Sequence, residues 1–140
     1  MSNRIDAISA FLDVESAVEG YVNAMGLKTE HIEEGKVVMS MLVKQNTVNI
    51  YGIIHGGALA GLLDTCMGLT CFTLGKQVVT LDMQVNYIKS AKLGEKLTAT
   101  STVLHAGEST IMLEALVVNE NNEVVSKGSA NFFVVGQARL

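Results

Sequence analysis

The sequence of 140 residues contains no proline, no tryptophan and only two cysteines, and just 17% of its residues are charged. No repeat and no linker interrupts it, so we expect a single domain over residues 1–140, large enough to bury a core. The formal net charge of −4 comes without any basic block, which argues against nucleic-acid binding. Because 49% of the residues are hydrophobic, intrinsic disorder is excluded.

The two cysteines, Cys66 and Cys71, lack the CxxC spacing of redox and metal sites. A helix would turn them to different faces, so we do not expect a disulfide between them. Free buried thiols suit a reducing compartment, and no metal site is expected. Residues 1–20 carry acids throughout and no apolar signal-peptide core, which favours a cytoplasmic location.

One long apolar run covers residues 56–75 and holds a single charge, Asp64. Its length of about 20 residues would suffice for a membrane span. However, the run also holds five glycines and three threonines, and a carboxylate at mid-bilayer costs roughly 2.5–3.5 kcal/mol. The segments on both sides alternate as strands of a soluble protein do. We therefore expect a helix buried at the centre of a soluble fold, and no contact with a membrane.

Before this run, residues 1–25 carry apolar side chains at helix-like spacings (Ile8, Leu12, Val18, Val22 and Met25), which predicts an amphipathic N-terminal helix closed by Gly26. Five segments have the composition of β-strands: residues 36–43, 78–88, 95–104, 109–118 and 123–135. In the second of these, strict alternation would place Leu81, Met83, Val85 and Tyr87 on one face and Thr80, Asp82, Gln84 and Asn86 on the other.

Because the last four strands follow one another through short turns, we expect an antiparallel sheet. A sheet curled around the apolar helix would explain why that helix has no polar face. The predicted fold is therefore α+β, with a five-stranded antiparallel sheet wrapped around one long central helix. Its core would cover residues 36–136, with an extra helix at the N-terminus.

The pattern Asn49-x5-His55-Gly56-Gly57-x6-Asp64, followed by TLDMQVNYIKSAKLGEKL, resembles the hotdog-fold acyl-CoA thioesterases of the 4-hydroxybenzoyl-CoA thioesterase superfamily. It is most similar to the branch with the phenylacetate-pathway thioesterase and its animal mitochondrial relatives, over about residues 37–135. The resemblance implies hydrolysis of an aryl- or fatty-acyl-CoA to a free acid and CoA. No separate cofactor is implied, since CoA is part of the substrate. Many relatives have a proline in the turn where this chain has Lys89-Ser90-Ala91, a difference in turn shape.

Gly56 and Gly57 would open the central helix, where backbone N–H groups lack intrahelical partners and the helix dipole favours an oxyanion. The resemblance implies that the Gly56 N–H binds the thioester oxygen, with Gly57 also at the substrate. The alternative is that both glycines only let the strand turn into a closely packed helix. A carboxylate such as Asp64 in an apolar helix is either paired structurally or retained for chemistry. The resemblance favours catalysis by Asp64, as nucleophile or as general base.

The remaining candidates each have a structural alternative. By resemblance, Asn49 positions the water or the thioester, although it could simply form a turn. We expect a supporting role for His55 rather than a proton shuttle. Thr80 matches a serine or threonine that lies near the carboxylate in relatives, or is a plain strand residue. Lys89 and Lys92 could meet the CoA phosphates, or lie in a solvated turn.

Helix geometry also predicts the assembly. Gly56 and Asp64 are eight residues apart, so they would stand about 12 Å apart along one helix. If both act on one thioester, the carboxylate must come from a second chain. We therefore expect a homodimer with two composite sites, and by resemblance a dimer of dimers. The alternative functions are a hotdog acyl dehydratase or hydratase, which would use the His as base, and a non-catalytic acyl-CoA-binding hotdog protein.

Overall fold

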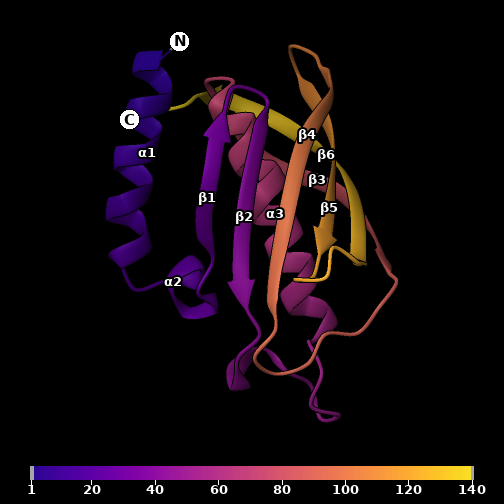
Figure 1. The fold of residues 1–140 in the computed structure, drawn as a ribbon. Coiled ribbons are helices and arrows are strands. Elements are labelled where there is room, and N and C mark those ends of the chain that lie inside the picture. Colours follow the sequence, from indigo (N-terminus) through magenta and orange to yellow (C-terminus); the bar gives the residue numbers. More distant parts are fainter. Residues whose placement is uncertain (1, 140) are drawn as a thin grey trace.

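The apolar run folds as one uninterrupted helix, α3 (Gly56–Thr73), against the inner face of a curved antiparallel sheet (Figure 1). The structure is a computed structural model that describes residues 2–139. Two helices, α1 (Ser2–Ala17) and α2 (Tyr21–Met25), precede the sheet. The strands of the sheet are β1 (Lys28–Glu33), β2 (Lys36–Leu42), β3 (Lys76–Tyr87), β4 (Lys96–Ala106), β5 (Thr110–Val118) and β6 (Val124–Gln137). A short 3-10 helix, η1 (Gln45–Thr47), lies between β2 and α3.

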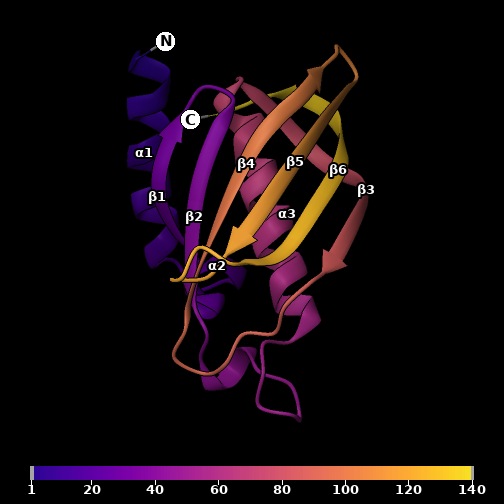
Figure 2. The same ribbon diagram turned by 45° about the vertical axis from the view of Figure 1, so that its right-hand side comes forward.

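The strand order is β1-β2-β4-β5-β6-β3, with every neighbouring pair antiparallel. The strands that precede and follow α3 therefore lie in different parts of the sheet, and β3 pairs with β6 at one edge. Figure 2 shows the sheet curving in front of α3, with α1 beside β1 at the other edge. The predicted hotdog class is confirmed.

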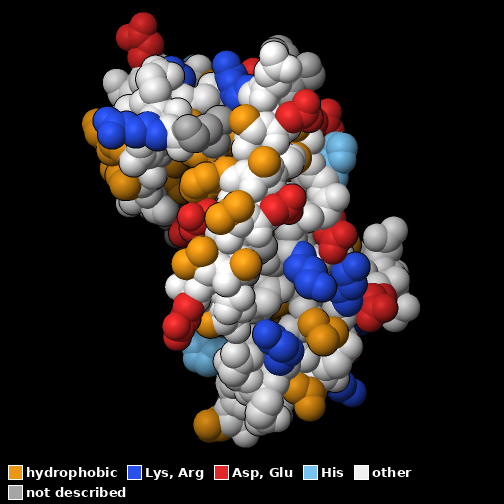
Figure 3. Space-filling model, turned by 90° about the vertical axis from the view of Figure 1, so that its left-hand side faces the viewer, with side chains coloured by type: hydrophobic (Ala, Val, Ile, Leu, Met, Phe, Trp, Pro, Cys, Tyr) orange, Lys and Arg blue, Asp and Glu red, His pale blue; other side chains and the backbone are white. Residues whose placement is uncertain are grey.

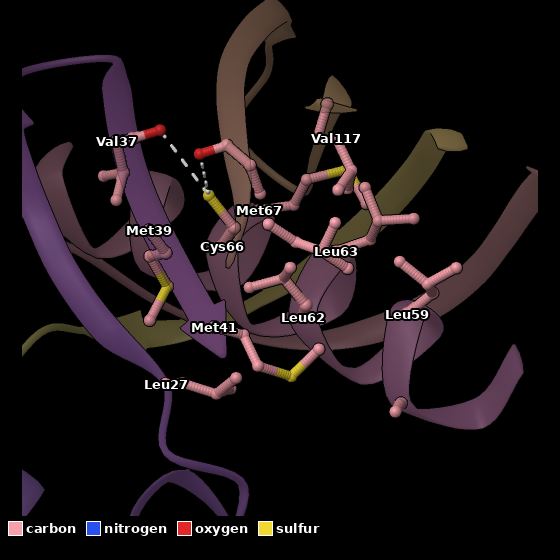
Figure 4. Packing of buried hydrophobic residues seen from close by; sticks show 14 of the residues in the cluster. Leu27, Val37, Met39, Met41, Leu59, Leu62, Leu63, Cys66, Met67 and Val117 are labelled. Carbon is pink, nitrogen blue, oxygen red and sulfur yellow. Dashed lines mark hydrogen bonds between the residues drawn. The ribbon is translucent and has the colours of Figure 1, made fainter. Parts of the chain in front are cut away.

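The two faces of α3 have different surroundings. One face packs into the core against the sheet and contains the buried residues Ala58, Leu59, Leu62, Leu63, Cys66, Met67, Thr70, Cys71 and Thr73. Their spacings of three and four residues form the apolar stripe of a helix that covers a sheet (Figure 4). The other face carries Gly61, Asp64, Thr65 and Gly68, which are only half-buried. Asp64 thus lies on the side of the helix that faces the edge strand β3.

The predicted strand number was wrong, because the sheet has six strands and the prediction missed β1. The strand KTEHIE is mostly exposed and rich in charged side chains, so it shows no apolar alternation. Such a sequence is tolerated at a sheet edge, where only one side needs a pairing partner. The other five strands lie within a few residues of their predicted positions.

The single N-terminal helix was also predicted incorrectly, since residues 18–20 separate α1 from α2. Gly20 precedes α2, and Val18 is exposed rather than on a buried face. The predicted end at Gly26 is confirmed: this residue takes the left-handed conformation, with φ of 68°, and caps α2. Ile8 of α1 is fully buried, so the first helix does use part of its apolar pattern.

Strand β3 contains a bulge at Leu81, which breaks the strict alternation that the sequence predicted. Thr80 pairs with Phe132, whereas Asp82 already pairs with the preceding residue Asn131. The extra residue changes which side chains face α3. Before the bulge Thr80 faces the helix, and after it Met83, Val85 and Tyr87 do so. Thr80 and Tyr87 therefore share one side of the sheet, although the predicted alternation separated them.

Among residues 2–139, no helix is both long enough and apolar enough to cross a bilayer.

Candidate active site

His55 caps the N-terminus of α3. Its backbone N–H donates to the Thr47 carbonyl over 2.8 Å, and its Nδ1 atom accepts a hydrogen bond of 2.8 Å from the Gly57 N–H. A neutral imidazole that accepts at Nδ1 carries its proton on Nε2. The exposed edge of the His55 ring is therefore a hydrogen-bond donor, and the backbone N–H of Gly57 is already used by the cap.

Gly56 presents an N–H group that has no hydrogen-bond partner among the described residues. Its carbonyl accepts a bond of 2.9 Å from the Tyr87 hydroxyl, and an added Cβ would lie 3.3 Å from the Tyr87 ring. Tyr87 therefore stands over the helix start, close to the free N–H. Sequence reasoning placed Tyr87 on the apolar face of its strand but did not single it out, because nothing in the alternating pattern shows that its hydroxyl reaches Gly56.

Asn49 forms a turn before the helix. Its Oδ1 atom accepts from the backbone N–H groups of Tyr51, at 2.9 Å, and Ile53, at 3.4 Å. The side-chain oxygen thus has the structural role that the sequence left open as an alternative. Its side-chain amide donates to no acceptor among the described residues, so Nδ2 is available to a ligand.

Asp64 lies eight residues after Gly56 on the open face of α3. The Thr80 hydroxyl donates to the Asp64 carboxylate over 2.7 Å, so the bulged strand β3 places Thr80 beside the carboxylate. A cavity of about 670 Å³ opens at this pair and is lined by both N-terminal helices, both edge strands and α3. Burial, followed by the negative charge of Asp64, raises the pKa of the Tyr21 hydroxyl in α2. Tyr21, which lies near the carboxylate, is the second site residue that sequence reasoning missed, after Tyr87.

These groups form two separate half-sites in one chain. The N-terminal half-site contains Asn49, His55, Gly56, Gly57 and Tyr87. The carboxylate half-site contains Asp64 and Thr80. Because α3 is continuous from Gly56 to Thr73, the two half-sites lie about 12 Å apart along its axis.

The candidate phosphate-binding lysines lie in a recess of about 520 Å³ that also contains Glu95, Glu120 and Glu123. Lys89 forms an ion pair with Glu123, and this hydrogen bond lowers the pKa of the Glu123 carboxyl. No ion pair of Lys92 occurs within the described part of the chain. The recess therefore combines acidic with basic groups, and Lys92 is the amine left open to an anion.

Both cysteines are free and buried, as predicted. The Cys66 thiol donates weakly to the carbonyl oxygens of Val37, at 3.5 Å, and Ala99, at 3.8 Å (Figure 4). Burial raises the pKa of Cys66 to about 12. A thiol that stays protonated and has no access to a cavity is not a nucleophile at neutral pH.

The fold agrees with the comparison to known families. Residues 51–126, more than half of the chain, match the family model of the thioesterase superfamily. The chain therefore belongs to the thioesterase superfamily. The matched region contains Gly56, Asp64 and Thr80.

Within that family, the chain is similar to acyl-coenzyme A thioesterases. It is 33% identical to human acyl-coenzyme A thioesterase 13 over 97 residues, which cover 67% of this chain and 69% of the human protein. A structure of a hypothetical thioesterase from Streptococcus pneumoniae with coenzyme A superposes with a TM-score of 0.79 at 34% identity, over 81% of this chain and 91% of that one. The PaaI protein of Escherichia coli shares the fold, with a TM-score of 0.88 over 97% of this chain and 96% of PaaI at 24% identity.

Proposed function

We propose that the protein hydrolyses aryl- or fatty-acyl-CoA to the free acid and CoA, in two composite sites of a homodimer. The observation that carries this proposal is the pair of half-sites on one continuous helix. A donor group at the start of α3 and a carboxylate about 12 Å further along it cannot meet at one thioester within one chain. In a two-fold dimer, each site takes the N-terminal half-site of one subunit and the carboxylate half-site of the other.

The edge strand β3 supports this assembly. It is 12 residues long and has a partner on one side only, which leaves a row of backbone groups for another chain. Beside the helix start, Ile50 and Tyr51 are 92% and 80% exposed, more than apolar side chains favour in a lone subunit. A second pairing of dimers would cover apolar side chains on the sheet's outer surface, namely Leu42, Leu104, Met112, Leu116 and Phe133.

Each group has a chemical role in this site. The free N–H of Gly56, with the helix dipole behind it, would stabilise the negative charge on the thioester oxygen. Asp64 either attacks the acyl carbon or takes a proton from the attacking water, and Thr80 holds its carboxylate in place. His55 donates from Nε2, and the side-chain amide of Asn49 supplies a further donor. Lys92, which has no ion pair among the described residues, would bind a CoA phosphate.

The tautomer of His55 argues against the dehydratase alternative. A dehydratase needs the imidazole as a base, whereas the Gly57 N–H occupies Nδ1 and leaves the proton on Nε2. The non-catalytic alternative would leave the Asp64–Thr80 pair beside the cavity without a task.

The pneumococcal relative gives independent support. Structures of that protein have been solved for one variant with an aspartate replaced by alanine and for another with a threonine replaced. The two replaced residues lie sixteen positions apart, the same separation as Asp64 and Thr80.

The test is complementation between two inactive chains. Asn49→Ala and Asp64→Ala chains are unfolded, mixed and refolded, and release of free CoA thiol is measured across aryl- and fatty-acyl-CoAs. In a mixed dimer one site collects both defects and the other none. With random pairing and independent sites, about a quarter of wild-type activity should return from two nearly inactive parents. A mixture as inactive as its parents, with subunit exchange proven by an affinity tag on one of the two chains, would contradict the shared site.

A further inference from the structure

The N-terminal helices contact α3 at three points, two near its end and one in its first half. At the end of α3, the Arg4 guanidinium donates to the Thr73 carbonyl over 3.4 Å. One residue earlier on α3, the rings of Phe72 and Phe11 lie with centroids 5.9 Å apart. Further toward the start of α3, Tyr21 of α2 reaches Gly61. Helices held at three such points form a fixed wall opposite α3.

The contact of Tyr21 with Gly61 depends on the missing side chain. A Cβ added at Gly61 would lie 1.7 Å from the Tyr21 hydroxyl oxygen, so the hydroxyl occupies the space where any other residue would have its side chain. Gly61 is three residues before Asp64, and such residues are neighbours on one helix face. The negative charge of Asp64 contributes to the raised pKa of Tyr21, after burial, which agrees with this closeness.

The space between this wall and α3 is the cavity of about 670 Å³, within the size range of small-molecule sites. Apolar side chains from both sides line it, including Leu12 and Val22 from the wall and Leu69 and Phe132 from the core. Asp64 and Thr80 lie in the same lining, and charged residues such as Asp13 and Lys76 lie there too. Figure 3 views the side of α1, where hydrophobic side chains gather in the hollow beside this helix.

We infer that α1 and α2 form one wall of the acyl-binding cavity, and that Tyr21, seated against Gly61, is the positioning residue that fixes this wall beside Asp64. The inference rests on the proposed function and adds which subunit selects the acyl group. A thioester carbon at Asp64 places its apolar acyl chain in the cavity of the subunit that supplies the carboxylate. The CoA part then extends toward the partner subunit. Acyl selectivity thus depends on the N-terminal helices.

Chain-length selectivity tests the wall. Leu12→Trp narrows the cavity from the α1 side, and Leu12→Ala widens it. Val14→Trp is the matched control, because Val14 lies on the same helix but is 65% exposed and does not line the cavity. The substrates run from acetyl-CoA to palmitoyl-CoA and include phenylacetyl-CoA. The measured quantity is kcat/KM for the longest acyl-CoA that is hydrolysed, divided by kcat/KM for the shortest. We expect at least about a tenfold fall for Leu12→Trp, a rise for Leu12→Ala, and no change for Val14→Trp.

A pH titration followed by tyrosinate absorbance tests the packing of Tyr21 against Gly61. The difference between wild type and Tyr21→Phe gives the part of the absorbance change that comes from Tyr21. We expect the raised pKa of Tyr21 to fall toward its ordinary value in Gly61→Ala, which displaces the hydroxyl. It should persist in Gly68→Ala, where the added methyl makes only an ordinary contact of 3.5 Å with Phe132. The selectivity ratio should change in Gly61→Ala as well.

Identical selectivity in Leu12→Trp, Leu12→Ala and wild type would contradict the claim that α1 and α2 form a wall of the acyl-binding cavity. An equal pKa of Tyr21 in both glycine variants would contradict the claim that its hydroxyl packs against Gly61. Failure of the proposed function looks different. In that case the wild-type protein releases no CoA thiol from any member of the panel.

Discussion

Asp64 and Cys66 are two residues apart on α3, yet one side chain reaches a cavity and the other is sealed beneath the sheet. A helix turns roughly 200° over two residues, so they point to nearly opposite sides. On the sheet side, close packing keeps the Cys66 thiol protonated. On the open side, a threonine hydroxyl and a cavity surround the carboxylate. The difference shows that position on the helix face, rather than residue reactivity, decides which group is available for chemistry.

Removing the charge on the open face should have the largest effect. Asp64→Asn keeps the size of the side chain and its contact with Thr80, so the fold should survive. We expect kcat to drop by at least about 10²-fold, the scale for an acid–base or nucleophilic group. The measurement is CoA thiol release, with circular dichroism to verify folding. Near-wild-type turnover would remove Asp64 from the mechanism.

The start of α3 should give an intermediate effect. In Gly56→Ala, the N–H remains, but the new methyl lies 3.3 Å from the Tyr87 ring and crowds the place of the thioester oxygen. We expect a loss of about tenfold, mainly in kcat, if the contact tightens in the transition state. Separate values of kcat and KM test this expectation. Gly136→Ala, which has open space around its added methyl, is the control. Lower stability with unaltered kinetics would instead indicate that Gly56 serves packing alone.

The sheet face should give the smallest effect on activity. Cys66→Ala should leave turnover unchanged, and iodoacetamide should not label the folded wild-type thiol near pH 8. The pKa of about 12 in the folded state exceeds the ordinary value of 9.0, so the unfolded chain ionises first as pH rises. The stability contribution of Cys66 is therefore complete below about pH 9 and decreases between 9 and 12. Urea unfolding should show the wild-type advantage over Cys66→Ala shrinking across this window. A constant advantage would contradict the buried thiol.

The elements with strong apolar patterns could be predicted from sequence. One long apolar run and strands joined by short turns predicted the central helix, five of the strands and a sheet wrapped around the helix. The hotdog class followed from the resemblance carried by the motif from Asn49 to Asp64. The strand β1 could not, because its exposed residues KTEHIE are stabilised by pairing with β2 rather than by burial. The break between α1 and α2 also escaped, since spacing alone cannot show where a helix stops and restarts.

The candidate site was predictable where a motif marks it. His55, Gly56 and Asp64 stand in a recognisable pattern, and the structure places them on or at one helix as expected. Tyr21 and Tyr87 carry no such signal, because each reaches the site through tertiary structure. The sequence held one clue to Tyr21. Gly61 lies within a helical run, where a glycine often leaves room for a side chain from another element.

The bulge in β3 has a consequence in genetic terms. Leu81 is 55% exposed, so a missense change there should be mild in the subunit. Loss of its codon should also be mild, because Thr80 and Asp82 already pair with the consecutive residues Phe132 and Asn131, and the shortened strand keeps this register. Loss of the Gln84 codon is a different lesion, because the later residues of the strand would shift by one place and turn to the opposite side. Val85 would leave the core, and Tyr87 would leave Gly56. Beyond the bulge, selection therefore acts on the count of residues as well as on their identity.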